Sequence, residues 1–159
     1  MMAAVTHVQR VDVAGETYDI AVREEDQTHY TARSLHTQGY GSGKTQEEAI
    51  EQLERYVNDN HPHQFDLMPE KDREELLAWV KDKLMPGIRG SSERYSSYHL
   101  KHIAEKAVIG YVSNGQMKGA LLAAGYEPAK GTDRSHINWD FVLRRGLAEK
   151  IEAEMARAR

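Results

Sequence analysis

The apolar residues between positions 100 and 111 recur every three or four residues, and this spacing constrains the fold more than any other feature of the chain. The spacing predicts one helix. Its buried face would carry Leu100, Ile103, Ala104, Ala107, Val108 and Tyr111. Charged and polar residues occupy the opposite face, so we expect Lys101 to be exposed there.

A second helix is predicted at about 115–124, directly after a short polar break. Ser113 or Asn114 can cap this helix, because a short side-chain oxygen accepts from its unpaired backbone N–H groups. Gly125 suits the left-handed residue that ends a helix. The residues predicted to face the core are Met117, Ala120, Leu121 and Ala124.

Residues 126–129 and 136–143 predict a β-hairpin around a polar turn at 131–135. Helix, turn, helix and hairpin together follow the order of a winged helix-turn-helix. In this arrangement the two helices pack on the hairpin. We therefore expect four large side chains to be buried together: Tyr111, Leu121, Trp139 and Phe141.

Alternating residues in the first part of the chain predict three strands, at 5–13, 17–23 and 29–35. Ala14-Gly15 is the expected turn between the first two strands. A glycine-rich loop is expected at 39–43. Thr45 and Glu48 then form a capping-box pattern, which predicts the start of a helix that reaches about residue 58.

The predicted fold class is α+β, with a small β-β-β-α module followed by a helical, winged helix-turn-helix-like module. Pro62 and Pro69 bound a segment without periodicity, which we interpret as a linker. A helix is expected at 71–84 and a basic loop at 88–94. The resulting domains are 1–60, a linker at 61–69, 70–146, and a helical tail at 147–159.

Charge divides the chain into an acidic and a basic half. Residues 1–80 contain 7 Lys+Arg and 16 Asp+Glu, whereas residues 81–159 contain 14 and 9. The basic half is the one expected to meet phosphates. The chain has no cysteine, which excludes disulfides and thiolate metal sites. No apolar run is long enough for a membrane span and no signal peptide is recognised, so a cytoplasmic location is expected.

Three chemical motifs are considered and set aside. The string GYGSGKT lacks the first glycine of a phosphate-binding loop, because Gln38 stands there. His61 with His63, and His99 with His102, have no third ligand at a known spacing, so neither a metal nor another cofactor is expected. The protein is therefore predicted not to be an enzyme. A small nuclease built on Ser135-His136 is the best enzymatic alternative, although neighbouring strand residues point to opposite faces.

Basic and polar side chains of the second half form a more coherent group. A helix in the major groove and a wing on the backbone would place them along one duplex. Gln116 is the residue expected to read a base edge, whereas Lys118 and Arg134 are the main phosphate contacts. The candidate nucleic-acid-binding residues are Arg89, Arg94, Tyr98, Lys101, Gln116, Lys118, Lys130 and Arg134.

The strand-rich first module resembles the N-terminal half of HicB-type antitoxins. The matching residues open the predicted helix and are Gly43, Thr45, Glu47, Glu48, Ala49 and Ile50. The resemblance covers about 45 residues. It implies a partial RNase H-like module that lacks catalysis and holds a toxin partner, as in a HicA/HicB-like toxin–antitoxin component.

The central stretch resembles uncharacterised proteins of phages and integrative elements over about 45 residues. The matching residues are Ser97, Tyr98, Leu100, Lys101, His102, Tyr111, Asn114, Gly115, Lys118, Ala120, Ala124, Gly125, Tyr126, Asn138, Trp139 and Phe141. This resemblance implies an origin in a mobile element.

Two main hypotheses for function follow. The first is a nucleic-acid-binding regulator of a phage or mobile element, with duplex DNA as the expected partner. The second is a protein-binding inhibitor of a host defence nuclease, similar to anti-CRISPR proteins, whose acidic surface mimics phosphates. The residues of that surface would be Asp12, Asp19, Glu24, Glu25 and Asp26. A homodimer is left open for either.

Overall fold

The computed structural model describes residues 5–84, 90–107 and 110–158, and it confirms the α+β class. The chain divides into two compact units, each with its own hydrophobic core. The first unit comprises Met1–Asn60 with Ser135–Ile137, and the second comprises His61–Arg134 and Asn138–Arg159.

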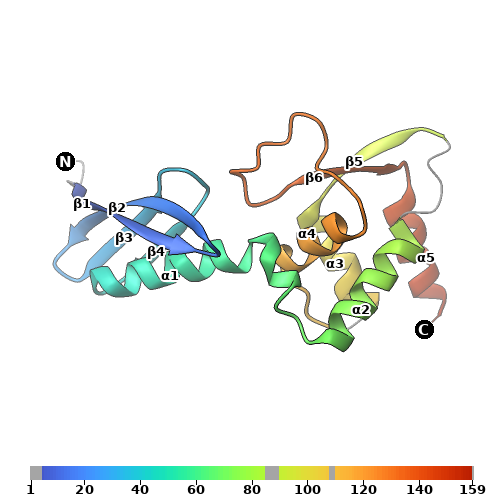
Figure 1. Ribbon diagram of the computed structural model, residues 1–159, viewed down its shortest axis with the longest axis horizontal. Coiled ribbons are helices and arrows are strands. Elements are labelled where there is room, and N and C mark those ends of the chain that lie inside the picture. The colour runs from blue at the N-terminus through green and yellow to red at the C-terminus, as the bar shows by residue number, and fades with distance from the viewer. Residues whose placement is uncertain (1–4, 85–89, 108–109, 159) are drawn as a thin grey trace. The chain divides into compact units, whose positions relative to one another are not determined.

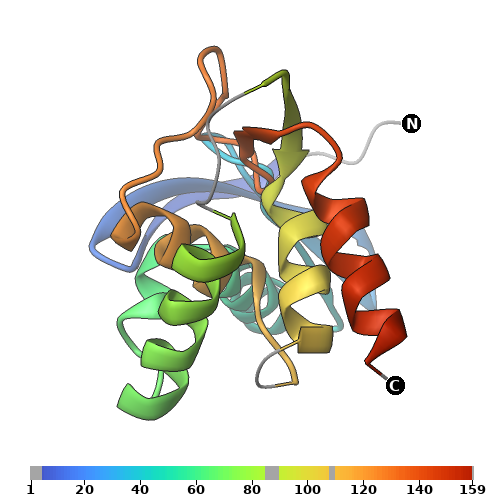
Figure 2. The same ribbon diagram turned by 90° about the vertical axis from the view of Figure 1, so that its right-hand side faces the viewer.

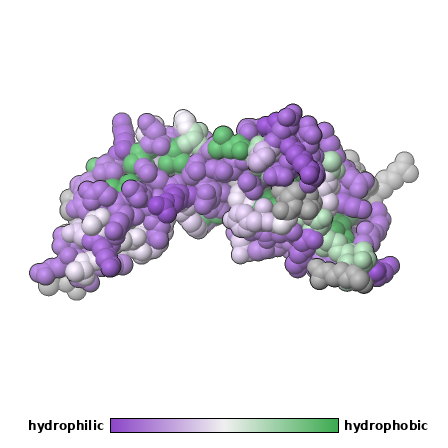
Figure 3. Space-filling view, turned by 90° about the horizontal axis from the view of Figure 1, so that it is seen from below, coloured by the Kyte–Doolittle hydropathy of each residue, from purple (hydrophilic) through white to green (hydrophobic). Residues whose placement is uncertain are grey.

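None of the described helices is long and apolar enough to cross a membrane. Hydrophilic residues predominate on the face in Figure 3, where hydrophobic residues form small, separate patches.

The first unit is an antiparallel sheet with one helix packed on it (Figure 1). The strands pair in chain order and are β1 (Val5–Val13), β2 (Glu16–Asp26), β3 (His29–Ser34) and β4 (Tyr40–Gly43). Helix α1 (Gln46–Asp59) follows. The predicted turn between β1 and β2 is confirmed, and both of its residues are left-handed, with φ of 56° at Ala14 and 78° at Gly15.

Strand β4 corrects the prediction of a glycine-rich loop, so the module is β-β-β-β-α. Gly41 and Gly43 lie directly under α1, which approaches too closely for a side chain. A Cβ atom on Gly41 would lie 2.1 Å from the Ala49 carbonyl oxygen, and one on Gly43 would lie 2.4 Å from the Glu48 Cβ. The glycines therefore serve the packing of a helix on a strand.

The start of α1 follows the predicted capping chemistry. The backbone N–H of Glu48 donates to the Thr45 hydroxyl at 3.2 Å, and the Glu48 carboxylate accepts the N–H of Lys44 at 2.7 Å. The core between helix and sheet consists of Val13, Tyr18, Ile20, Val22, Ala32, Ala49, Leu53 and Val57.

The second unit is mainly helical. Its elements are η1 (Pro62–Phe65), α2 (Glu70–Trp79), a π-turn η2 (Val80–Leu84), β5 (Ser92–Ser96), α3 (Ser97–Ala107), α4 (Asn114–Ala123), β6 (Asp140–Arg144) and α5 (Leu147–Arg157). Helices α3 and α5 lie side by side (Figure 2). The tail helix α5 packs into the core through Leu147, Ala148 and Ile151.

The predicted hairpin of 126–129 with 136–143 is wrong. Strand β6 pairs instead with β5, in the segment expected to be a basic loop. Pro128 has no backbone N–H to donate, which weakens the predicted partner strand. A single backbone bond, from the Ala129 N–H to the Asp140 oxygen at 2.7 Å, joins the two segments there.

Residues 61–69, interpreted as a linker, pack in the second unit. Phe65 and Met68 are buried in its core, and Pro62 begins a short 3-10 helix. The predicted burial of Leu121, Trp139 and Phe141 is confirmed, but Tyr111 is 76% exposed. Helix α3 ends at Ala107, so the helical spacing no longer applies at Tyr111; Val108 lies outside the described residues.

Candidate nucleic-acid interface

Helix α4, the element expected to enter a major groove, lies in the middle of the second unit's core. Met117, Ala120 and Leu121 are buried as predicted, whereas Ala124 is half-buried. The side that carries Gly119 is covered by η1, since a Cβ atom on Gly119 would lie 2.3 Å from both the Phe65 Cβ and the Pro62 oxygen. A groove-reading role for α4 would require η1 to leave the core.

Lys118 was expected on the exposed side of this helix, but it is 3% exposed. Its ammonium lies 4.5 Å from the centroid of the Trp139 ring, where a cation–π contact partly replaces water. Burial lowers the pKa of Lys118 to about 8. The sequence shows only one apolar face, so the rest of the helix was expected to be exposed. In the structure α4 is covered on most of its circumference.

Gln116, expected to read a base edge, caps the helix instead. Its side-chain oxygen accepts the backbone N–H of Ser113 at 2.9 Å, and its own N–H donates to the Ser113 hydroxyl at 3.1 Å. This reciprocal capping box confirms Ser113 as the N-cap. The capping bond already uses the oxygen that base recognition would need.

Lys101 is also buried rather than exposed. Its ammonium donates to Glu105 at 2.8 Å and to the Val112 carbonyl at 3.2 Å. Burial raises the pKa of Glu105, but hydrogen bonds from Lys101 and from the Val112 N–H outweigh it and lower the pKa overall. Tyr98, in contrast, is 51% exposed beside this pair, with its ring centroid 5.6 Å from the Lys101 ammonium.

Several exposed cations lie on and beside β5 and β6. In the register of these strands Ser92 lies opposite Arg144, and Arg94 opposite Val142. These residues therefore share the outward face, while Tyr95 and Phe141 point into the core. We define the basic ribbon as the exposed cations on and beside this strand pair: Arg94, Lys130, Arg144, Arg145 and Lys150.

Arg94 joins the strand pair to the following loop. Its guanidinium donates to the Lys130 carbonyl at 2.5 Å and lies 3.7 Å from the Asp140 carboxylate. Both Arg94 and Lys130 are exposed. An ion pair in this setting contributes little and can be exchanged for a phosphate contact.

Glu93 fixes the position of α5 relative to β5. Gly146, which starts α5 with φ of 76°, donates its N–H to the Glu93 carboxylate at 2.8 Å, and the Tyr95 hydroxyl donates to the same group. These bonds lower the pKa of Glu93, while burial and the nearby Glu93 raise the pKa of Tyr95 to about 12. Lys150, one turn into α5, is thereby held near β6.

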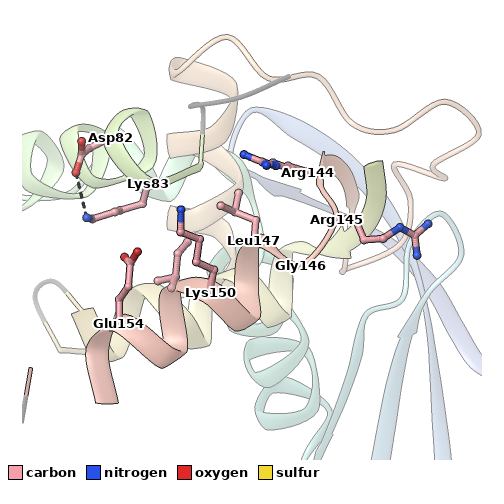
Figure 4. Close-up of a pocket in the computed structure, with 9 residues that line it drawn as sticks. Asp82, Lys83, Arg144, Arg145, Gly146, Leu147, Lys150 and Glu154 are labelled. Atoms are coloured by element: carbon pink, nitrogen blue, oxygen red, sulfur yellow. Dashed lines mark ion pairs between the residues drawn. The ribbon is translucent and has the colours of Figure 1, made fainter. Parts of the chain in front are cut away.

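A pocket of about 270 Å³ opens beside the ribbon (Figure 4). Four cations line it, namely Lys83, Arg144, Arg145 and Lys150, together with Asp82, Glu154, Gly146, Leu147 and Ile151. Asp82 pairs with Lys83 at 3.5 Å. Neither Arg144 nor Lys150 forms an ion pair with another residue that the structure describes. The excess of positive charge suits an anionic group.

Arg134 remains exposed in the loop before β6, where its guanidinium lies 5.5 Å from the Trp139 ring centroid. The nuclease alternative placed Ser135 and His136 on a strand, but they lie in this loop. Arg89 lies outside the described residues. Within the ranges that the structure describes, no three His, Asp or Glu side chains are grouped to hold a metal ion.

The acidic residues proposed as a phosphate mimic are spread over the first unit. Asp12 lies at one end of the sheet, opposite Thr17, whereas Glu24–Asp26 lie at the far end of β2. Seven residues of strand separate these ends, about 23 Å at the usual rise. Asp19 forms hydrogen bonds with His36 and Arg10, each at 3.0 Å, and these bonds lower its pKa. The five residues therefore do not form one acidic patch.

The sequence missed Arg144, Arg145 and Lys150. The alternation in 140–144 could have identified Arg144 as outward-facing, but β5 was read as a loop and the strand had no partner.

No known protein-family model, curated protein or solved structure matches this chain.

Proposed function

We propose that this protein is a non-enzymatic nucleic-acid-binding regulator of a mobile element, which contacts the phosphate backbone of duplex DNA through the basic ribbon. The observation that carries the proposal is the pair Arg144 and Lys150, two exposed cations without an ionic partner among the described residues. They lie at one pocket, and Figure 4 shows Arg145 pointing away from both of them.

The contacts would be made to phosphates, because α4 is covered and cannot read the major groove. Phosphate contacts fix a protein on DNA without carrying sequence information. We therefore expect binding with little sequence preference. The five cations of the basic ribbon would give a slope of about −4.5 when log affinity is plotted against log salt.

The test is a titration of fluorescein-labelled duplex DNA, followed by anisotropy at several salt concentrations. The double variant Arg144→Gln/Lys150→Gln should bind more weakly and should reduce the salt slope by about two units. The matched control is Lys71→Gln, which removes an exposed cation on α2, away from the pocket residues. This control should bind like the unchanged protein.

Two results would overturn the proposal. The first is no binding at tens of micromolar at low salt. The second is a double variant that keeps the full slope. Reversal of Glu24, Glu25 and Asp26 to lysine should leave DNA affinity intact or raise it, because these carboxylates repel phosphate. If the reversal instead abolished biological activity, the protein-binding hypothesis would be favoured.

A further inference from the structure

The sheet of the first unit has one face that α1 leaves uncovered. Residues on its inner face pack on α1, whereas those on the other face alternate outward. We define the outer sheet face by the residues that the strand alternation directs away from α1: Val8, Arg10, Asp12, Thr17, Asp19, Ala21, Arg23, Thr31, Arg33, Leu35, Tyr40 and Ser42. Of these, Thr31 is buried. Val8 and Leu35 are 58% and 59% exposed, and Tyr40 is 43% exposed.

The first unit is acidic overall, but its charged side chains are distributed unevenly between α1 and the sheet. Helix α1 carries Glu47, Glu48, Glu51, Glu54 and Asp59. The outer sheet face carries Arg10, Arg23 and Arg33, and all three are exposed. The same face also carries Asp12 and Asp19, so its three arginines exceed its aspartates by one. Arg23 and Arg33 are the cations complementary to an anionic partner.

The strand register places these residues in rows across the sheet. One row runs Val8, Ala21, Arg33 and Tyr40, and the next contains Arg23, Thr31 and Ser42. Arg23 and Arg33 are thus diagonal neighbours, about 7–8 Å apart in an antiparallel sheet. In the first row Ala21 lies between Val8 and Arg33, so two neighbouring positions in the middle of the face have small or apolar side chains.

Two of the three arginines are available to a ligand. Arg10 donates to Asp19 at 3.0 Å, which compensates its charge. Arg23 and Arg33 form no ion pair with another residue in the described part of the chain. The Arg33 guanidinium lies 5.2 Å from the centroid of the Tyr40 ring, so a planar cation and an aromatic ring stand together.

The geometry points to the outer sheet face as a binding surface for single-stranded nucleic acid. Unpaired bases stack on aromatic rings and guanidinium planes, here Tyr40 and Arg33, while cations such as Arg23 hold the backbone. A duplex hides the faces of its bases and would leave Tyr40, Val8 and Leu35 without a role. This surface is separate from the basic ribbon, and the inference does not depend on the ribbon's function.

The experiment uses the full chain and two labelled probes, a thymidine homo-oligomer and a hairpin duplex. The double variant Arg23→Gln/Arg33→Gln and the single variant Tyr40→Ala should each weaken binding of the single strand about tenfold. Tyr40→Phe keeps the ring and should retain affinity. Arg55→Gln on α1 removes an exposed arginine outside the outer sheet face and is the matched control.

The two surfaces can be distinguished by which probe each variant affects. Changes on the outer sheet face should weaken single-strand binding only, whereas Arg144→Gln/Lys150→Gln should weaken duplex binding. The inference is overturned if Tyr40→Ala binds the single strand like Tyr40→Phe, or if Arg55→Gln costs as much as Arg23→Gln/Arg33→Gln. It is also overturned if the outer-face variants weaken both probes equally.

Discussion

The two units differ in whether all their cations reach the surface. The first unit is acidic, yet its three sheet arginines all reach the surface on one face. The second half of the chain is basic, yet Lys101 and Lys118 are buried, one paired with Glu105 and the other against Trp139. Net charge therefore identifies the half of a chain that favours phosphate, but it does not identify the side chains that can reach it.

The units also share a construction principle. In each, a glycine lets a helix approach another backbone segment closely, with Gly41 under α1 and Gly119 against η1. Each has a separate core and a helix capped by a hydroxyl side chain. Because both units have a core, a glycine contact and a capped helix, the same kind of substitution can be made in each. The two changes in stability can then be compared.

The largest effects are expected from core truncation. Leu53 and Leu121 are both 0% exposed, one in each core. Leu53→Ala and Leu121→Ala should each lower the free energy of unfolding by about 2–5 kcal/mol, through lost burial and a residual cavity. Hydrogen exchange followed by mass spectrometry should show each loss mainly in its own unit. A loss below about 0.5 kcal/mol for either variant would contradict its placement in a core.

The glycine contacts should rank next. Gly41→Ala and Gly119→Ala each insert a Cβ atom into backbone contact, which typically costs about 1–3 kcal/mol. Chemical denaturation measures both changes. Gly15→Ala provides a contrast, because nothing lies within 4 Å of a Cβ there and its cost would come from the positive φ alone. Silent variants at both contact sites would show that the helices can shift without penalty.

The burial of Lys118 should appear in the pH dependence of stability. Its folded pKa of about 8 lies below the ordinary 10.5. Between these values the unfolded chain binds more protons than the folded one, so stability rises with pH. From pH 8 to 9.5 the gain should be about 1.5 kcal/mol.

The Lys118 prediction is checked by urea denaturation at both pH values, with Lys118→Met as the comparison. Methionine keeps most of the stem without the charge, so the rise should vanish in this variant. The window stays below 10.0, the ordinary pKa of tyrosine, above which the raised pKa of Tyr95 would make stability fall with pH. An unchanged rise in Lys118→Met would contradict the buried position of the ammonium.

The smallest effects are expected at the helix caps. Thr45→Ala should cost about 1 kcal/mol and Thr45→Ser almost nothing, because serine keeps the accepting hydroxyl. Ser113→Ala should cost more than Thr45→Ala, since Ser113 is buried and its capping box is reciprocal. Thermal unfolding measures both. Equal costs would show that burial adds nothing to the cap.

Sequence reasoning succeeded where the structure depends on neighbouring residues. The turn at Ala14-Gly15, the cap at Thr45 and the cap at Ser113 are all local, and each could be predicted from backbone chemistry. The apolar stripe of α4 was also predicted, because it follows from helical spacing alone.

The errors have a common cause, namely packing between segments far apart in the sequence. Strand β5 exists because β6 pairs with it across more than forty residues. Lys118 is buried because η1 and Trp139 complete the surroundings of α4. Arg94 and Lys130 of the basic ribbon were predicted as contacts, but Arg144, Arg145 and Lys150 were recognised only with that pairing.

The packing of η1 against Gly119 changes how the chain should be divided for experiments. Composition suggests that a cut between His61 and Pro69 would be harmless, since proline-containing polar segments often form exposed linkers. Phe65 and Met68 belong to the core, however, so a fragment beginning at Glu70 would lose one wall of it. Limited proteolysis should accordingly spare this segment, and insertions or tags are tolerated poorly there.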